Sequence, residues 1–205
     1  MDNFKTGNHG MLRQQNLAGI MHHLYENAPI SRIELARLTG LNKATVSSLI
    51  NELLTNQFIC EIGAGESKGT GRRTVLLDIN PTRGCIVSGE IGVDYISVIC
   101  TDFTAEVIWR QNISTADEQG MQAILDRLIA LLCQAVEAGR KQSGALLGLS
   151  LAVPGLIDRN NGTLLFAPNL GWQNVPVAEL LRKSFSAPIF VDNEATLAAL
   201  GEQYF

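Results

Sequence analysis

The hydrophobic positions in the first part of the chain recur at helical spacing in three segments, separated by short polar breaks. Residues 11–26, 31–38 and 43–55 each place their apolar side chains on one face of a helix. At the start of the second segment, Ser31 and Glu34 have the spacing of a capping box, in which each side chain bonds a backbone amide of the other residue. A three-residue turn with a central glycine joins the second and third segments, as in a helix-turn-helix.

The third segment carries small polar side chains outside its core positions, where a solvated helix more often carries Glu and Lys. Short side chains near the start of a helix let the backbone approach DNA, and their hydroxyls bond phosphates or base edges. The alternative is an ordinary three-helix subdomain with a polar face, but the order and spacing of box, turn and helix favour DNA binding. The expected DNA contacts from the helices are Arg32, Lys43, Ala44, Thr45, Ser47 and Ser48.

Two strand-like runs follow, at residues 58–62 and 74–78, and the segment between them contains four glycines. Lys68, Arg72 and Arg73 make this segment basic. A flexible basic hairpin beside a helix-turn-helix is typical of a wing, which contacts phosphates or places an arginine in the minor groove. A mobile solvated loop is the alternative. The context favours the wing, so the three basic residues are further expected DNA contacts.

Beyond residue 84 the pattern becomes that of an α/β lobe, which begins with three strand-like runs joined by short connections. The expected elements are strands at 85–91, 95–102, 106–114, 146–153, 163–166 and 189–191, and helices at 118–140, at 177–185 and from about 193. The predicted fold class is therefore α+β, with a winged helix-turn-helix domain over residues 1–80 and an α/β lobe over residues 84–205.

Composition refines this picture without changing it. The chain has 205 residues, of which 46% are hydrophobic and 18% charged, as in a globular protein. Neither a membrane-spanning run nor a secretory signal is evident, and the four cysteines form no C-x-x-C pair, so we expect a cytoplasmic protein with buried, reduced thiols. Residues 1–83 carry nine Lys and Arg against seven Asp and Glu, whereas the rest carries seven against thirteen. A basic head on an acidic body suits a DNA-binding protein.

Three motifs of the body resemble those of the ROK family (repressors, open reading frames and sugar kinases). They occupy residues 148–155, 167–172 and 191–195, and the head resembles the family's repressors at residues 31–36 and 71–73. The resemblance covers essentially the whole chain and is greatest to xylose-repressor-like and N-acetylglucosamine-repressor-like members. It implies that the body is the first lobe of the actin-like ATPase and sugar-kinase fold.

The resemblance also implies that the body has lost phosphoryl transfer. Kinases of the family carry an Asp-x-Gly-Gly-Thr loop for the nucleotide phosphates, and the matching stretch here is residues 90–94. Val93 places a branched side chain where close backbone approach is needed, and Asp94 places a carboxylate where a polyanion would lie. We therefore expect no catalytic residue and no enzymatic activity.

The family's sugar contacts match Asn169, Asn193 and Glu194. Glu194 replaces the catalytic Asp, and its longer side chain displaces the carboxylate by about one methylene, which harms catalysis but still allows a bond to a sugar hydroxyl. Amide side chains suit sugar hydroxyls because they both donate and accept. The residues alone favour a turn role for Asn169 and a helix-cap role for Asn193. Trp172 is expected to pack at the hinge of the cleft.

The family's second lobe and its His/Cys zinc site have no counterpart in these residues, so we expect no metal and no cofactor. The function predicted is a sugar-responsive repressor that binds double-stranded operator DNA as a homodimer or higher homo-oligomer. Xylose is the effector suggested by the resembling subgroup. Two alternatives stay open: a ROK sugar kinase with an added N-terminal domain, and a truncated DNA-binding module without a ligand, whose body serves only dimerisation.

Overall fold

The computed structural model describes residues 6–64, 74–116 and 120–204 of the chain. The chain divides into two compact units, Met1–Asn80 and Pro81–Phe205. No helix within the described ranges is long and apolar enough to cross a membrane.

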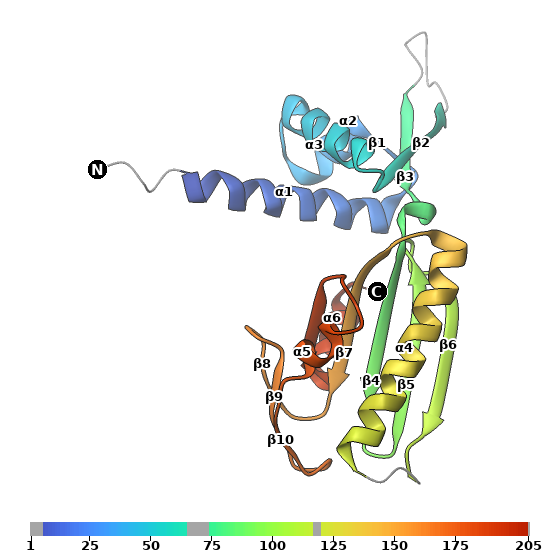
Figure 1. The fold of residues 1–205 in the computed structure, drawn as a ribbon. Coiled ribbons are helices and arrows are strands. Elements are labelled where there is room, and N and C mark those ends of the chain that lie inside the picture. The colour runs from blue at the N-terminus through green and yellow to red at the C-terminus, as the bar shows by residue number, and fades with distance from the viewer. Residues whose placement is uncertain (1–5, 65–73, 117–119, 205) are drawn as a thin grey trace. The chain divides into compact units, whose positions relative to one another are not determined.

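The first unit contains three helices and a small antiparallel sheet with the strand order β1-β3-β2 (Figure 1). Its elements are α1 (Thr6–Asn27), β1 (Ile30–Ser31), α2 (Arg32–Thr39), α3 (Lys43–Thr55), β2 (Ile59–Ala64) and β3 (Val75–Ile79). Leu24, Leu35 and Ile50, one from each helix, are fully buried in its core. The three predicted helices and the hairpin strands are confirmed. Strand β1 was not predicted, because two residues are too few to show an alternating pattern.

The second unit is built on a five-stranded sheet with the order β11-β7-β4-β5-β6. Its strands are β4 (Cys85–Ile91), β5 (Tyr95–Asp102), β6 (Val107–Ser114), β7 (Leu146–Val153) and β11 (Ile189–Asn193). Strands β4, β5 and β6 form the predicted antiparallel meander, and β7 and β11 run parallel to β4. The carboxyl ends of β4, β7 and β11 therefore lie at one edge of the sheet.

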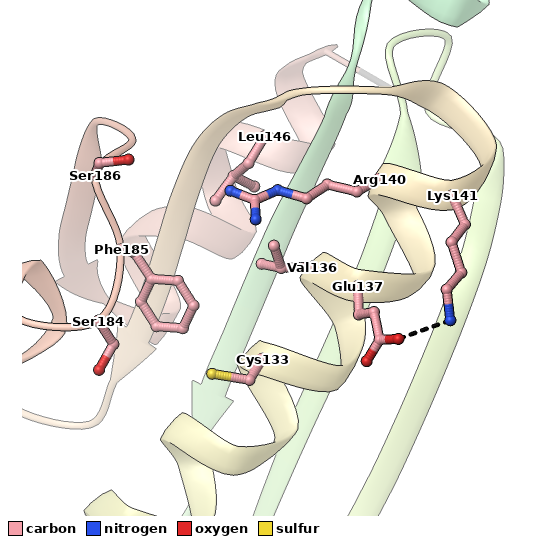
Figure 2. Close-up of a pocket in the computed structure, with 9 residues that line it drawn as sticks. All are labelled: Cys133, Val136, Glu137, Arg140, Lys141, Leu146, Ser184, Phe185 and Ser186. Carbon is pink, nitrogen blue, oxygen red and sulfur yellow. Dashed lines mark hydrogen bonds and ion pairs between the residues drawn. The ribbon is translucent and has the colours of Figure 1, made fainter.

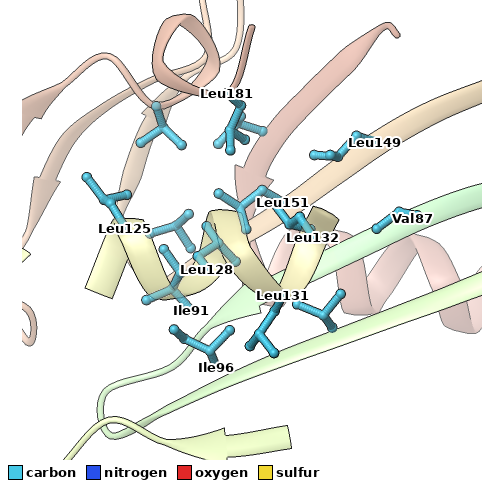
Figure 3. Close-up of a cluster of buried hydrophobic side chains, with 14 of the residues drawn as sticks. Val87, Ile91, Ile96, Leu125, Leu128, Leu131, Leu132, Leu149, Leu151 and Leu181 are labelled. Atoms are coloured by element: carbon cyan, nitrogen blue, oxygen red, sulfur yellow. The ribbon is translucent and has the colours of Figure 1, made fainter. Parts of the chain in front are cut away.

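Helix α4 (Met121–Ser143) covers one face of this sheet and supplies much of its core (Figure 3). Leu128 and Leu132 of α4 are fully buried, and Ile91, Ile96 and Leu151 of the strands lie beside them. The helix predicted over residues 118–140 is observed from Met121 to Ser143, and residues 117–119 lie outside the described residues. The alternation of buried and half-buried positions along β4 and β5 explains why the sequence pattern identified these strands.

A second, three-stranded antiparallel sheet has the order β10-β9-β8. The remaining elements are β8 (Leu156–Asp158), β9 (Thr163–Ala167), β10 (Trp172–Val175), α5 (Val177–Arg182) and α6 (Glu194–Tyr204). Strand β9 and both helices were predicted, but β8 and β10 were not. Trp172 is buried on β10, which fits a packing role.

The expectation that all four cysteines are buried is wrong for Cys133. Cys85 and Cys100 are buried and Cys60 is half-buried, whereas Cys133 is exposed on α4. Cys133 follows the buried pair Leu131 and Leu132 and lies at the exposed margin of the buried face of the helix.

Candidate DNA interface and sugar site

The start of each helix in the helix-turn-helix is fixed by side-chain bonds. The Ser31 hydroxyl accepts a hydrogen bond from the amide of Glu34 at 3.2 Å, and the Glu34 carboxylate accepts one from the amide of Ser31 at 3.1 Å. The Ser31 hydroxyl also donates to this carboxylate at 2.7 Å. That bond, followed by the one from the Ser31 amide, lowers the pKa of Glu34. Gly40 ends α2 with φ +68°, and Asn42 caps α3 by accepting from the amide of Thr45 at 2.8 Å. The predicted capping box and turn are confirmed.

Helix α3 separates a buried face from a polar face. Val46, Leu49, Ile50 and Leu53 are buried against the rest of the first unit. The predicted DNA contacts lie away from this core: Lys43, Ala44 and Ser48 are exposed, and Thr45 and Ser47 are half-buried. The turns at the start of α3 thus present short polar side chains around one lysine. This arrangement allows a helix backbone to approach a groove closely.

Arg32 is held by residues from two other elements. Its Nη1 donates to Oδ1 of Asn51 on α3 at 2.9 Å, and its Nη2 lies 3.4 Å from Oε1 of Glu61 on β2. Sequence reasoning missed both partners, because they lie far along the chain and meet Arg32 only when β2 passes α3. Of the other predicted DNA contacts, Lys68, Arg72 and Arg73 lie outside the described residues, so the wing contacts stay predictions.

In the second unit, Tyr95 closes the loop that matches the kinase phosphate loop. The amide of Gly92 donates to the carbonyl of Tyr95 at 2.8 Å, and a Cβ on Gly92 would overlap the Tyr95 ring. The Tyr95 hydroxyl donates to Oε1 of Glu90 at 2.5 Å. This bond, helped by burial and by the charges of Glu90, Asp94 and Glu194, raises the pKa of Tyr95 to about 12. Sequence reasoning gave Tyr95 no role, since the residue reads simply as the start of a strand.

Both polar atoms of the Asn193 side-chain amide form hydrogen bonds within the protein. Its Oδ1 accepts from the backbone amides of Ala195 at 2.9 Å and Thr196 at 3.3 Å, which caps α6. Its Nδ2 donates to the carbonyl of Gly155 at 3.1 Å and to Oε2 of Glu194 at 2.7 Å. The amide thus links the ends of β7 and β11 and orients the Glu194 carboxylate. Asn193 therefore acts as a helix cap in this structure, the role that its residue type alone suggested.

Asn169 lies at the tip of the turn between β9 and β10, where it is exposed. Bonds from the amides of Leu170 and Gly171 to the carbonyls of Ala167 and Pro168 shape this turn. No hydrogen bond joins Asn169 to Asn193 or Glu194, so the three expected sugar contacts do not form one bonded cluster. Near Asn193, Arg159 pairs with Asp192 at 2.8 Å, a contact that the sequence did not indicate.

A groove of about 400 Å³ lies elsewhere in this unit, between α4 and the segment after α5 (Figure 2). Its lining residues are Cys133, Val136, Glu137, Arg140, Lys141, Leu146, Ser184, Phe185 and Ser186. None of the expected sugar contacts lines it, and its Lys141 is paired with Glu137 at 2.7 Å. Among the described residues, no group of three or more His, Cys, Asp or Glu side chains is placed to hold a metal ion.

Comparisons with known proteins agree with both halves of this description. Residues 86–205 match the ROK family, and residues 15–59 match a winged helix-turn-helix DNA-binding family. The chain is 40% identical over 199 residues to the xylose repressor of Caldicellulosiruptor bescii, an alignment that covers 97% of this chain and 50% of that protein. The chain thus spans about half the length of this curated relative.

Two solved structures show the same fold. One is a ROK family transcriptional regulator homologous to the E. coli MLC protein, with a TM-score of 0.76 and 24% identity over 95% of this chain and 49% of that one. The other is a ROK family glucokinase from Streptomyces griseus in complex with glucose and AMPPNP, with a TM-score of 0.50 and 24% identity. That match covers 60% of this chain and 37% of the glucokinase.

Proposed function

Because this chain belongs to the ROK family, we propose that it acts in a sugar-responsive transcriptional repressor that binds operator DNA through its winged helix-turn-helix. The observation that carries the proposal is the polar start of α3, whose cap at Asn42 fixes the helix and whose exposed face carries Lys43 and Ser48. The name of the xylose repressor relative supports xylose as the effector.

In the proposed complex, the first two turns of α3 enter the major groove. Lys43 neutralises a phosphate, and the hydroxyls of Thr45, Ser47 and Ser48 bond phosphates or base edges. Ala44 allows close approach, and the wing residues contact the neighbouring backbone or minor groove. Two copies of the chain would read two half-sites of an operator, as dimeric helix-turn-helix proteins do.

The proposed sugar site lies at the carboxyl ends of β7 and β11. Glu194 would accept a hydrogen bond from a sugar hydroxyl, with its carboxylate held in place by the Nδ2 of Asn193. Asn169 would reach the sugar from the turn between β9 and β10. Sugar binding can lower operator affinity only if the sugar binds the DNA-free state more tightly than the DNA-bound state.

We further propose that the body does not transfer phosphate and needs no cofactor. A nucleotide phosphate at this loop would meet the Tyr95 ring over Gly92 and the carboxylate of Asp94. The backbone amide of Gly92 is already bonded to Tyr95. The rival function, a sugar kinase with an added DNA-binding head, requires this loop to open and accept a polyanion.

The test is an electrophoretic mobility shift with operator duplexes selected from a random pool, with xylose, glucose or N-acetylglucosamine added. We expect sequence-selective binding that one sugar weakens. Lys43→Ala should weaken binding and reduce the slope of log affinity against log salt by about 1. Arg127→Ala, an exposed change on α4, should do neither.

Three results would contradict the proposal or part of it. Binding without sequence preference would remove the repressor function, and ATP-dependent phosphorylation of a hexose or pentose by the chain would establish the kinase instead. Operator binding that no sugar alters, in a protein that also contains the second lobe, would remove the sensing role.

A further inference from the structure

Asn51 extends the polar face of α3 beyond the residues expected to meet DNA. It follows Ser47 and Ser48 by four and three positions, so it lies on the same side of the helix one turn later, and it is exposed. We infer that Asn51 is a further DNA-contacting residue that acts only as a hydrogen-bond donor, and that Arg32 is the positioning residue that orients it. This inference rests on the proposed function and specifies the chemistry of the same interface.

The orientation of the Asn51 amide follows from its partner. The Arg32 guanidinium has donors and no acceptor, so it can pair only with the Oδ1 of Asn51, which it does at 2.9 Å. The Nδ2 group then points away from Arg32 with both of its hydrogens available. Within the described part of the chain, no acceptor bonds this Nδ2.

Arg32 is itself fixed at both ends of its guanidinium fork. While Nη1 bonds Asn51 on α3, Nη2 lies 3.4 Å from Glu61 on β2, and the side chain is only 31% exposed. On the neighbouring turn, Glu52 pairs with Arg13 of α1. The second half of α3 is therefore tied to α1, to the start of α2 and to β2. A planar fork that spans two elements holds its partner in one orientation.

A donor-only amide selects among the groups that DNA offers. It can bond a phosphate oxygen, the N7 of either purine, the O6 of guanine or the O4 of thymine, but it cannot accept from the amino groups of adenine or cytosine. An unconstrained asparagine, by contrast, commonly pairs with adenine by donating to N7 and accepting from N6. The shared ligand chemistry is thus a hydrogen-bond acceptor, on either the backbone or a base edge.

The experiment selects duplexes with the 205-residue chain from a random pool and then measures affinity and salt dependence for a set of variants. Asn51→Ala removes both functions of the amide, whereas Asn51→Asp keeps an acceptor for Arg32 and loses the donor. Both should weaken binding by roughly 5- to 20-fold, the effect of one or two hydrogen bonds. Asn56→Ala, which alters an exposed amide at the end of the same helix, should leave affinity unchanged.

Arg32→Ala distinguishes positioning from direct contact. If Arg32 acts through Asn51, its loss weakens binding with an unchanged salt slope, and the double variant with Asn51→Ala is no weaker than the Asn51→Ala variant alone. If Arg32 instead contacts a phosphate, the slope falls by about 1 and the two losses add, which overturns the positioning role. Thermal unfolding of the Arg32→Ala variant, measured in parallel, identifies a purely structural role. In that case the stability falls while the DNA affinity of the folded protein stays the same, and this result also overturns the inference.

The selected sequences identify the acceptor. Loss of preference at a single base position assigns a base-edge acceptor, and an equal loss on all sequences assigns a phosphate; either supports the inference. Wild-type affinity for Asn51→Ala or Asn51→Asp overturns it. If the unaltered chain enriches no sequence, the proposed function itself fails. If the chain enriches a sequence and the Asn51 variants bind it with wild-type affinity, only the DNA-contacting role of Asn51 is refuted.

Discussion

Replacing Gly139 with alanine would push a methyl group into the contact between α4 and the sheet. A Cβ at this position would lie 2.5 Å from the Sγ of Cys85, 2.6 Å from the Sγ of Cys100 and 2.8 Å from the Cβ of Cys85. Non-bonded heavy atoms pack best at about 3.5–4.0 Å. Both cysteines are fully buried on the neighbouring strands β4 and β5. Relief of the overlap would therefore require α4 itself to shift.

The size of the effect follows from two opposing contributions. Overpacking a core by a methyl group costs about 1–3 kcal/mol, and three overlaps against two strands place this site near the upper end. Alanine in a helix returns up to about 1 kcal/mol relative to glycine. We therefore expect Gly139→Ala to lower the free energy of unfolding by about 1–2 kcal/mol. Gly201→Ala is the matched control, because a Cβ on this α6 residue meets nothing within 4 Å; it should stabilise the body slightly.

Urea unfolding followed by tryptophan fluorescence measures this difference in the second unit alone, because both tryptophans, Trp109 and Trp172, belong to it. Adding Cys85→Ala and Cys100→Ala removes the two sulfur contacts, so part of the loss from Gly139→Ala should vanish in that background. A midpoint for Gly139→Ala at or above that of the wild type would refute the reasoning. So would equal shifts at Gly139 and Gly201.

Three further predictions concern the head and the candidate site. Because Ser31 lowers the pKa of Glu34, the capping box stabilises the head fully above the unfolded pKa near 4.5, and this stabilisation is lost as the pH falls through the lowered folded pKa. Ser31→Ala should lower the free energy of unfolding by about 1 kcal/mol at pH 7 and weaken this pH dependence, as measured by thermal unfolding followed by circular dichroism. Tyr95 should ionise with a pKa of about 12 in an ultraviolet titration, so the stabilisation from its bond to Glu90 is complete below pH 10 and disappears as the pH rises through 12. Ionisation of every tyrosine near pH 10, or a titration curve that Tyr95→Phe does not change, would contradict this. Asn193→Ala should lower the free energy of unfolding by about 1–2 kcal/mol through the lost helix cap and abolish the sugar binding measured by calorimetry, whereas Asn193→Asp should keep the cap. If both variants bind sugar as the wild type does, Asn193 does not belong to the sugar site.

The fold was predictable where local chemistry alone determines an element. Helix α3 starts at Lys43 because Asn42 caps it, and its buried positions repeat at helical spacing, so sequence and structure agree on its bounds. Strand β7 is a continuous apolar run and was also identified residue for residue. Strands β8 and β10 were missed because strands of three and four residues exist only through pairing with β9, which the sequence does not encode locally.

The candidate site was less predictable, because its side chains act through partners distant in the chain. The family resemblance suggested Asn169, Asn193 and Glu194 as sugar contacts, but the bond from Asn193 to Gly155 spans 38 positions and became visible only in the structure. Arg32 was expected to meet DNA directly, whereas its bond to Asn51 supports the inferred role of orienting that amide.

If the lobe does not accept nucleotides, as proposed, a bound sugar is not phosphorylated and dissociates unchanged. A kinase empties its site by turnover, so its occupancy reflects the rate of reaction as well as the supply of substrate. With Tyr95 lying over Gly92, occupancy would depend only on the free sugar concentration and the dissociation constant. The occupancy of the lobe would then report the concentration of free sugar rather than the rate at which sugar is consumed. It would not change with the ATP level of the cell.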